Sequence, residues 1–283
     1  MKKLLLIAAG ICFTVFTFAQ DAAEKLNQAQ EALKAKDYVK AYTLYDQAMS
    51  NLGDVQVDAS VNFNIGYAAC KSGNVEGAEK YMAKAIAANV KVADCYENLA
   101  ELYTDKKDFA KAVENYEKAM ANATTGVEAM AFKAGSAAYN GKSYDKAIAM
   151  FDKCIAANYK GETAYYYKSV ILKAQNKAPE SKVALEEGLA KYPGDAKMAP
   201  ALAKVYVAEG NEFYKKGAAI VSEANTKVTA GKLKTDDPAY ATELGKAKVE
   251  FEAAISVLEK AKTLDPSNAN IQKLLDACAA AMK

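Results

Sequence analysis

The chain has 283 residues, 52% of them hydrophobic and 25% charged, which is typical of a folded protein and argues against a disordered one. All 37 basic residues are lysines, against 35 acidic residues, so a nucleic-acid partner, which favours a basic excess and arginine, is disfavoured. Because the chain has no histidine, it also lacks the usual general base, the histidine-activated nucleophiles and the commonest zinc ligand.

The N-terminal 19 residues have the layout of a secretory signal peptide. Lys2 and Lys3 precede an apolar run over residues 4–18, and the small residue Ala19 follows it. The alternative is a transmembrane anchor, which is disfavoured because the run is shorter than the ~20 apolar residues that a span needs. We therefore expect an exported protein whose mature chain begins at Gln20.

Four cysteines remain after the expected signal peptide, and they lie far apart in the sequence: Cys70, Cys95, Cys154 and Cys278. Since none belongs to a C-x-x-C pair, the spacing indicates neither a metal knuckle nor a redox dithiol. We expect all four to be buried as small apolar side chains. The sequence predicts no metal site and no cofactor.

From Gln20 onward the sequence predicts helices in pairs, without the alternation typical of strands. In the second helix of each pair a small residue recurs at intervals of 37, 34, 35 and 34 residues, at Ala41, Ala78, Ala112, Ala147 and Ser181. A large residue follows four positions later, at Tyr45, Met82, Tyr116, Phe151 and Leu185. Another small residue comes three positions beyond it, at Ala48, Ala85, Ala119, Cys154 and Gly188. Each first helix also has one small residue, and in chain order these are Ala29, Gly66, Ala100, Gly135 and Ser169.

At these residues the sequence resembles the tetratricopeptide repeat family, and the resemblance covers most of the chain after residue 19. It implies antiparallel helix pairs in which small residues permit close approach, while the large residue fills the gap toward the next pair. Because one pair cannot bury its apolar face alone, pairs stack on their neighbours. The implied fold is an all-α, right-handed superhelical solenoid, with five repeats over residues 20–194.

In residues 195–283 the period changes. The pattern of residues 210–217 looks like the middle of another first helix, yet it continues to about residue 230 without a turn. Asp237 and Pro238 predict a helix start, because aspartate caps free backbone amides and proline suits the first helical position. Further helices are expected over residues 238–264 and about 269–282. We therefore predict a lengthened helical hairpin closed by a capping helix.

The resemblance also implies a binding site, since the family's concave face, lined by first helices, commonly binds an extended peptide or a partner's helix. Projecting the family's groove positions onto this chain gives Phe63, Tyr67, Asp94, Glu97, Glu101, Asp105, Phe132, Tyr139, Asn140 and Tyr166, with Lys71, Ser136, Val170 and Lys173 beside them. Aromatic side chains with polar tips suit adaptable recognition. The alternative for the aromatics is packing against adjacent helices.

The acidic residues of the third repeat follow helical spacing and so share one face, between aromatics on either side. They are either solvated charge or a seat for a basic segment of a partner. The lysines expected to balance them are Lys106, Lys107 and Lys111. The clamp for a terminal carboxylate that some family members build from lysine, arginine and asparagine finds no matching set in this chain.

The function that the resemblance implies is a non-enzymatic protein–protein interaction scaffold. Together with the short signal peptide, it indicates a bacterial cell-envelope protein located in the periplasm, whose partner is a protein or peptide. The second hypothesis is an accessory subunit of an outer-membrane assembly or secretion machine, held by its convex face or its C-terminal hairpin. A third, a hydrolase that uses only carboxylates, requires paired acids ~5 to 10 Å apart in a deep cleft.

Overall fold

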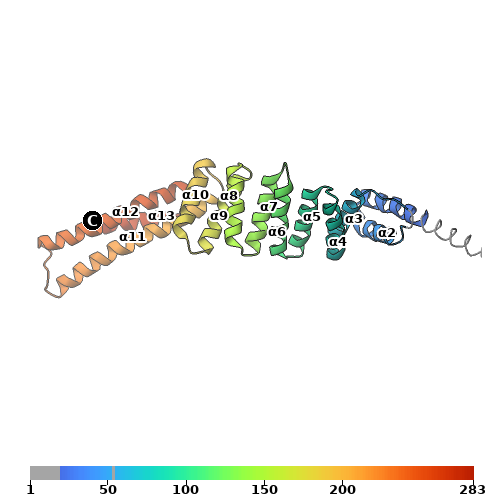
Figure 1. The fold of residues 1–283 in the computed structure, drawn as a ribbon. Coiled ribbons are helices and arrows are strands. Elements are labelled where there is room, and N and C mark those ends of the chain that lie inside the picture. Colours follow the sequence, from blue (N-terminus) through green and yellow to red (C-terminus); the bar gives the residue numbers. More distant parts are fainter. Residues whose placement is uncertain (1–19, 53–54) are drawn as a thin grey trace, which may run out of the picture. The chain divides into compact units, whose positions relative to one another are not determined.

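The computed structural model describes residues 20–52 and 55–283, so the expected signal peptide lies outside the described residues. Within the described residues the regular secondary structure is helical, without strands (Figure 1). The chain divides into two compact units, Met1–Tyr159 and Lys160–Lys283, called unit 1 and unit 2 below. The division of residues 20–194 into five repeats stays a prediction.

Unit 1 consists of consecutive helix pairs (Figure 1). Residues 20–34 are helical and are followed by α2 (Tyr38–Ser50), α3 (Ser60–Ser72), α4 (Val75–Ala87), α5 (Val92–Asp105), α6 (Phe109–Asn122), α7 (Val127–Asn140) and α8 (Tyr144–Ala156). The helices α3, α5 and α7 pack on α4, α6 and α8 as the two members of a pair. Contacts of α2 with α3, α4 with α5 and α6 with α7 join one pair to the next.

Unit 2 contains one further pair and a long hairpin. Its helices are α9 (Gly161–Ala174), α10 (Ala178–Lys191), α11 (Met198–Thr229), α12 (Pro238–Leu264) and α13 (Ala269–Ala281). The hairpin helices α11 and α12 have 32 and 27 residues, whereas α9 and α10 have 14 each. The expected helix start is confirmed, because Pro238 is the first residue of α12 and Asp237 accepts a hydrogen bond of 2.9 Å from the Ala239 backbone amide.

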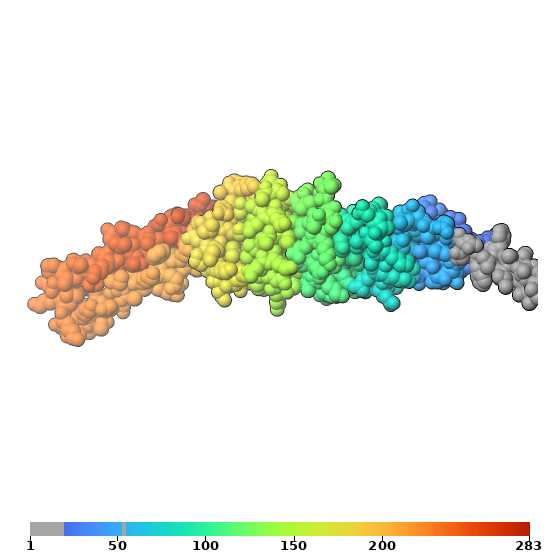
Figure 2. Space-filling model, viewed as in Figure 1, coloured from blue at the N-terminus to red at the C-terminus, as the bar shows by residue number. Residues whose placement is uncertain are grey.

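The recurring residues of the sequence pattern form the core. Every small and large position named above is buried. A methyl group added at Gly66 would come within 2.9 Å of the Met82 side chain, and one at Gly135 within 3.1 Å of the Phe151 ring. The small residues therefore permit the close approach of paired helices that the sequence predicts. In the space-filling view the face of unit 1 runs from one helix to the next without a visible gap (Figure 2).

The turn inside each pair has the same backbone geometry. One residue with positive φ, between 58° and 77°, occupies it in every copy: Lys36, Gly73, Lys107, Lys142 and Asn176. Their spacing repeats that of the buried small residues. At Lys107 the following amide, that of Asp108, bonds back to the Tyr103 carbonyl at 2.9 Å, which closes the end of α5. Only one copy is glycine, so this register cannot be found by searching the sequence for glycine.

All four cysteines of the described chain are buried free thiols, which confirms the expectation that they serve as small apolar side chains. Burial raises the pKa of the Cys70 thiol to about 12 and that of Cys95 to about 11. Because the thiolate is the reactive form, these two cysteines are held in the unreactive state at neutral pH.

Candidate protein-binding surfaces

The site residues projected from the sequence lie on first helices, but they belong to both units. Unit 1 holds Phe63 and Tyr67 on α3, the four acids on α5, and Phe132, Tyr139 and Asn140 on α7. Tyr166 and the neighbouring projected residues Val170 and Lys173 lie on α9 of unit 2. We call the side of unit 1 formed by α3, α5 and α7 the first-helix surface.

Two lysines neutralise the central acids of the first-helix surface. The Glu101 carboxylate accepts hydrogen bonds from Lys71 Nζ of α3 at 2.8 Å and from Lys133 Nζ of α7 at 2.7 Å. Lys133 also donates to Glu97 at 2.8 Å. These four residues form an ion ladder that ties α3, α5 and α7 together, in the middle of the predicted acidic floor.

The prediction that Lys106, Lys107 and Lys111 balance the acids of α5 is wrong. Lys111 pairs with Glu79 of α4, at 3.7 Å, and not with the acids of α5. The reason is geometric. Lys106, Lys107 and Lys111 come after the end of α5, whereas Lys71 of α3 and Lys133 of α7 lie on the neighbouring first helices, beside the middle of α5. Lys133 comes one position after the projected residue Phe132, so the projection passed over it.

Pairing within the ion ladder favours the charged forms of Glu101 and Lys133. Burial alone would raise the pKa of Glu101, but hydrogen bonds from Lys133 and Lys71 bring it below its usual value. Burial alone would lower the pKa of Lys133, and its hydrogen bonds to Glu101 and Glu97 raise it instead. The ladder side chains are 25 to 42% exposed, so the pairing is partly screened by water.

The two outer acids of α5 differ from the central ones. Asp94 and Asp105 are exposed near opposite ends of the helix, and in the described part of the chain neither belongs to an ion pair. Asp94 lines a small polar pocket of about 250 Å³ with Lys91 and residues 122–125. The predicted acidic floor is therefore a neutral ladder flanked by two single carboxylates.

The aromatic residues of α3 are half-buried and lie in a row. The rings of Phe63 and Tyr67 stack with 6.3 Å between their centroids, and the edge of Tyr38 meets Tyr67 at 5.8 Å. Lys91 Nζ lies 4.6 Å from the Phe63 ring centroid, and Lys71 Nζ 5.6 Å from that of Tyr67. Both rings therefore pack against neighbours on one side and keep a partly exposed side.

The aromatic residues of α7 are arranged differently. Phe132 makes edge contacts with Phe151 of α8, at 5.9 Å, and with Tyr159, at 6.3 Å, which is the packing alternative stated for this residue. Tyr139 is half-buried, and Asn140 is the exposed last residue of α7. Of the projected aromatics in unit 1, those of α3 offer the larger continuous row.

In unit 2 the three projected residues of α9 converge on one cleft. Tyr166, Val170 and Lys173 line a cavity of about 390 Å³ whose opposite wall is α11 and whose floor is α10. The remaining lining residues are Ser169, Ser181, Leu185, Lys197, Pro200, Ala201, Lys204 and Val205. We call this cavity the lysine cleft. The projection missed Lys197 and Lys204 because α11 departs from the repeat pattern, although their spacing of seven places them on one helical face.

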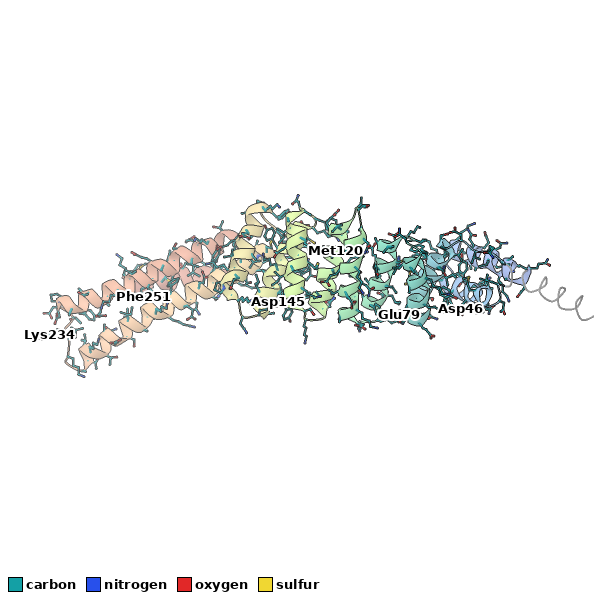
Figure 3. All side chains as sticks on the ribbon, viewed as in Figure 1. Asp46, Glu79, Met120, Asp145, Lys234 and Phe251 are labelled. Atoms are coloured by element: carbon teal, nitrogen blue, oxygen red, sulfur yellow. The ribbon has the colours of Figure 1, made fainter. Side chains whose placement is uncertain are left out.

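The second helices of unit 1 take part in another set of polar contacts, which include Asp46 and Glu79, both labelled in Figure 3. Asp46 of α2 accepts hydrogen bonds from Tyr81 Oη at 2.7 Å and Lys80 Nζ at 3.2 Å, both of α4. Glu79 of α4 accepts one from the Tyr103 hydroxyl. Between α6 and α8, Lys146 Nζ lies 3.0 Å from Glu117. These contacts join each helix pair of unit 1 to the next one.

The hairpin of unit 2 carries an open apolar cavity of about 720 Å³. It lies along the far half of α11, where Ala218 and Val221 face Phe251 of α12, labelled in Figure 3, and Ala281 of α13. Close packing of the hairpin depends on glycine, since a methyl group at Gly217 would come within 2.7 Å of the Phe251 ring.

One sequence family matches the chain. Residues 93–123, which cover α5 and α6 and the turn between them, match the tetratricopeptide repeat model. The structure repeats this helix pair, with its buried small residues and its left-handed turn, before and after the matched segment. Residues 93–123 of this chain are therefore identified as a tetratricopeptide repeat.

Several solved structures are similar to this chain. One is a tetratricopeptide repeat protein from Parabacteroides merdae, with 20% identity and a TM-score of 0.47, covering 92% of this chain and 99% of that one. The C-terminal part of a repeat protein from Cytophaga hutchinsonii has 18% identity and a TM-score of 0.47, covering 96% and 97%. A repeat protein from Bacteroides fragilis has 20% identity and a TM-score of 0.39, covering 92% and 98%. No curated protein matches this chain.

The tetratricopeptide repeat fold is a scaffold for protein–protein interactions, and its family is non-catalytic. In the described residues of this protein, no cluster of three or more cysteine, aspartate or glutamate side chains is placed to hold a metal ion. Over the same ranges, no helix combines the length and the apolar character needed to cross a membrane.

Proposed function

We propose that this protein is a non-enzymatic scaffold of the bacterial cell envelope that binds an extended segment of a partner protein along its first helices. The observation that carries the proposal is the convergence of Tyr166, Val170 and Lys173 on one cleft. All three are groove positions that the family resemblance implies from the sequence. A cavity of about 390 Å³ falls in the range of ligand sites, and the half-buried aromatics of α3 supply a second contact row.

Export to the periplasm is supported by the arrangement of residues 1–19, with two lysines, an apolar run and a small residue. The proposal predicts that cell fractionation recovers the chain in the periplasm, with Gln20 as its N-terminal residue. An intact N-terminus retained in the membrane fraction would contradict export by cleavage.

Partner capture tests the scaffold proposal. The full chain, carrying a photo-crosslinking residue at position 67 or 166, is incubated with envelope extract, and crosslinked peptides are identified by mass spectrometry. We expect a discrete partner segment whose crosslinks disappear when Tyr139 and whichever of Tyr67 and Tyr166 does not carry the crosslinker are both replaced by alanine. The matched control is Tyr144→Ala with Tyr240→Ala, which are half-buried tyrosines outside the projected site. Equal loss in the control, or capture that the double variant at the projected site leaves unchanged, would overturn the proposal.

A second function, an accessory subunit of an outer-membrane assembly, is favoured by the apolar cavity of the hairpin. Its size and its apolar lining, with Ala218 and Val221 at the rim of the buried Phe251 ring, suit burial by another protein surface. Replacing Val221 by aspartate would then release the chain from the assembly while crosslinking at positions 67 and 166 persists. If the assembly survives this replacement, the hairpin is not the docking element.

A further inference from the structure

The lysine cleft of unit 2 presents three positive charges without a carboxylate among its lining residues. Lys173, Lys197 and Lys204 are exposed, and in the described chain none of them forms an ion pair. The nearest acid in sequence, Asp195, is occupied, since it accepts hydrogen bonds from the backbone amides of Lys197 at 3.0 Å and Met198 at 2.8 Å.

Lys173 and Lys204 also line an adjoining cavity with Glu186 and Glu209, but there Glu209 pairs with Lys182 at 2.8 Å and Glu186 accepts a hydrogen bond from the Tyr206 hydroxyl at 2.8 Å. Lys197 Nζ lies 5.8 Å from the centroid of the Tyr166 ring. Among the described residues the three lysines therefore lack ion-pair partners, whereas the lysines of the ion ladder in unit 1 have them.

The two serine hydroxyls of the cleft are already bonded within the protein. Ser181 Oγ donates to the Ser169 carbonyl at 2.8 Å, and Ser169 Oγ donates to the Tyr166 carbonyl at 2.7 Å. The floor and the remaining wall are apolar, with Leu185, Val170 and Val205 among the lining residues. Recognition in this cleft therefore depends on ammonium groups around an apolar and aromatic surface.

We propose that the lysine cleft binds an acidic peptide segment, in which aspartate or glutamate side chains meet the three lysines and apolar side chains between them cover Tyr166 and Val205. This inference rests on the proposed function, peptide docking on first helices, and names the chemical class of the peptide. The recognised groups are side-chain carboxylates along the segment, so a free C-terminus is not required.

Charge and shape together select this occupant. A basic segment would be repelled by three unpaired ammonium groups, and a neutral one would leave them without partners. A small anion would satisfy the charges but leave Tyr166, Val170 and Leu185 uncovered, whereas a peptide that alternates acidic and apolar residues meets both requirements. Lysines are point charges on flexible stems, and they suit carboxylates at variable positions better than a fixed bidentate geometry.

Fluorescence polarisation with the full chain tests the inference. The probe is a fluorescein-labelled, C-terminally amidated decapeptide of alternating glutamate and leucine. A matched probe has glutamine in place of glutamate. We expect the glutamate probe to bind at least about tenfold more tightly than the glutamine probe, and its affinity to fall as salt is raised from 50 to 300 mM, because exposed charge attraction is screened.

The variant Lys173→Gln, Lys197→Gln, Lys204→Gln is expected to weaken binding of the glutamate probe about tenfold or more. The control variant Lys232→Gln, Lys234→Gln, Lys273→Gln removes the same charge from exposed lysines outside the cleft, and its affinity should stay within about twofold of the parent. Equal weakening in the two variants would assign binding to net charge and overturn the inference. Inorganic phosphate that displaces the probe at millimolar concentration would reassign the cleft to a free anion.

The inference and the proposed function can fail separately. If crosslinks at position 166 identify a partner segment without acidic residues, or if the glutamine probe binds as well as the glutamate probe, the acidic class is wrong and the scaffold stands. If the glutamate probe binds in the cleft while no partner crosslinks at positions 67 or 166, the proposed scaffold function is wrong, and the cleft is still a binding site for acidic peptides.

Discussion

Lys133 of α7 and Glu101 of α5 lie 2.7 Å apart, with the lysine Nζ donating to the carboxylate, and Lys71 of α3 reaches the same carboxylate at 2.8 Å. One glutamate thus joins three successive first helices of unit 1. The Glu101 side chain, a projected groove residue, is therefore part of what holds neighbouring helix pairs together.

Replacing Lys133 by glutamine should lower the free energy of unfolding by about 1 kcal/mol, because Glu97 and Glu101 are left half-buried beside each other without their shared cation. Urea denaturation followed by circular dichroism measures the change. The control is Lys118→Gln, which removes a pair of 2.6 Å within α6 that is 47 and 58% exposed, and this should cost less than about 0.5 kcal/mol. Equal losses would show that the ladder does not couple the helices.

The pH dependence of stability should contain a contribution from Glu101. Its pKa is lower in the folded chain than its ordinary value, so folding favours the ionised form. This stabilisation is fully present above the ordinary glutamate pKa of about 4.3 and is lost as the pH falls below it. Thermal unfolding from pH 6 to pH 3 should be less steep in pH for Glu101→Gln than for the parent. A parallel dependence in both proteins would exclude this role.

The start of α6 offers a paired test of helix capping. The Asp108 carboxylate accepts a hydrogen bond of 3.2 Å from the Lys111 amide, whereas Ser143, at the equivalent start of α8, makes no side-chain capping bond. Asp108→Ala should therefore cost about 1 kcal/mol of unfolding free energy, and Ser143→Ala only a few tenths. Denaturant midpoints at equal slope measure both, and the prediction fails if the two costs agree.

Two helical glycines should respond to alanine in opposite directions. At Gly66 the added methyl group meets Met82 at 2.9 Å, so Gly66→Ala should lower the unfolding free energy by about 1 to 3 kcal/mol. At Gly245 of α12 nothing lies within 4 Å, so Gly245→Ala should raise it by about 0.5 to 1 kcal/mol through helix propensity. Loss of stability at both sites would mean that contact with Met82 is not what requires glycine in α3.

The packing of the helices could be predicted from the sequence because it depends on residue size at fixed intervals. Ala112 and Tyr116 are 0 and 2% exposed, as their places in the pattern require. The ends of the hairpin helices could be predicted as well, since Asp237 and Pro238 determine a helix start by local chemistry. Both features depend either on residues that are close together in the sequence or on residue types that recur at a fixed interval.

The charge pattern of the surfaces could not be predicted in the same way. Lys71 and Glu101 are 30 positions apart, and Lys133 is 32 beyond Glu101, so their pairing depends on the level at which α3, α5 and α7 face one another. Lys197 and Lys204 line the same cleft as Tyr166 only because α11 packs beside α9 and α10. The repeat pattern assigns single positions to a surface, but it does not determine which flexible lysine pairs with which acid.

The left-handed turn at one fixed place in each helix pair has an evolutionary consequence. Residues 74 and 108 each follow such a turn, at Gly73 and Lys107, and each is the cap residue of the next helix, Asn74 or Asp108. An in-frame duplication of the gene segment for residues 74–107 would join Lys107 to a second copy of Asn74, through a joint that the chain already uses. This protein can therefore gain or lose contact surface in steps of one helix pair, without inventing a new connection.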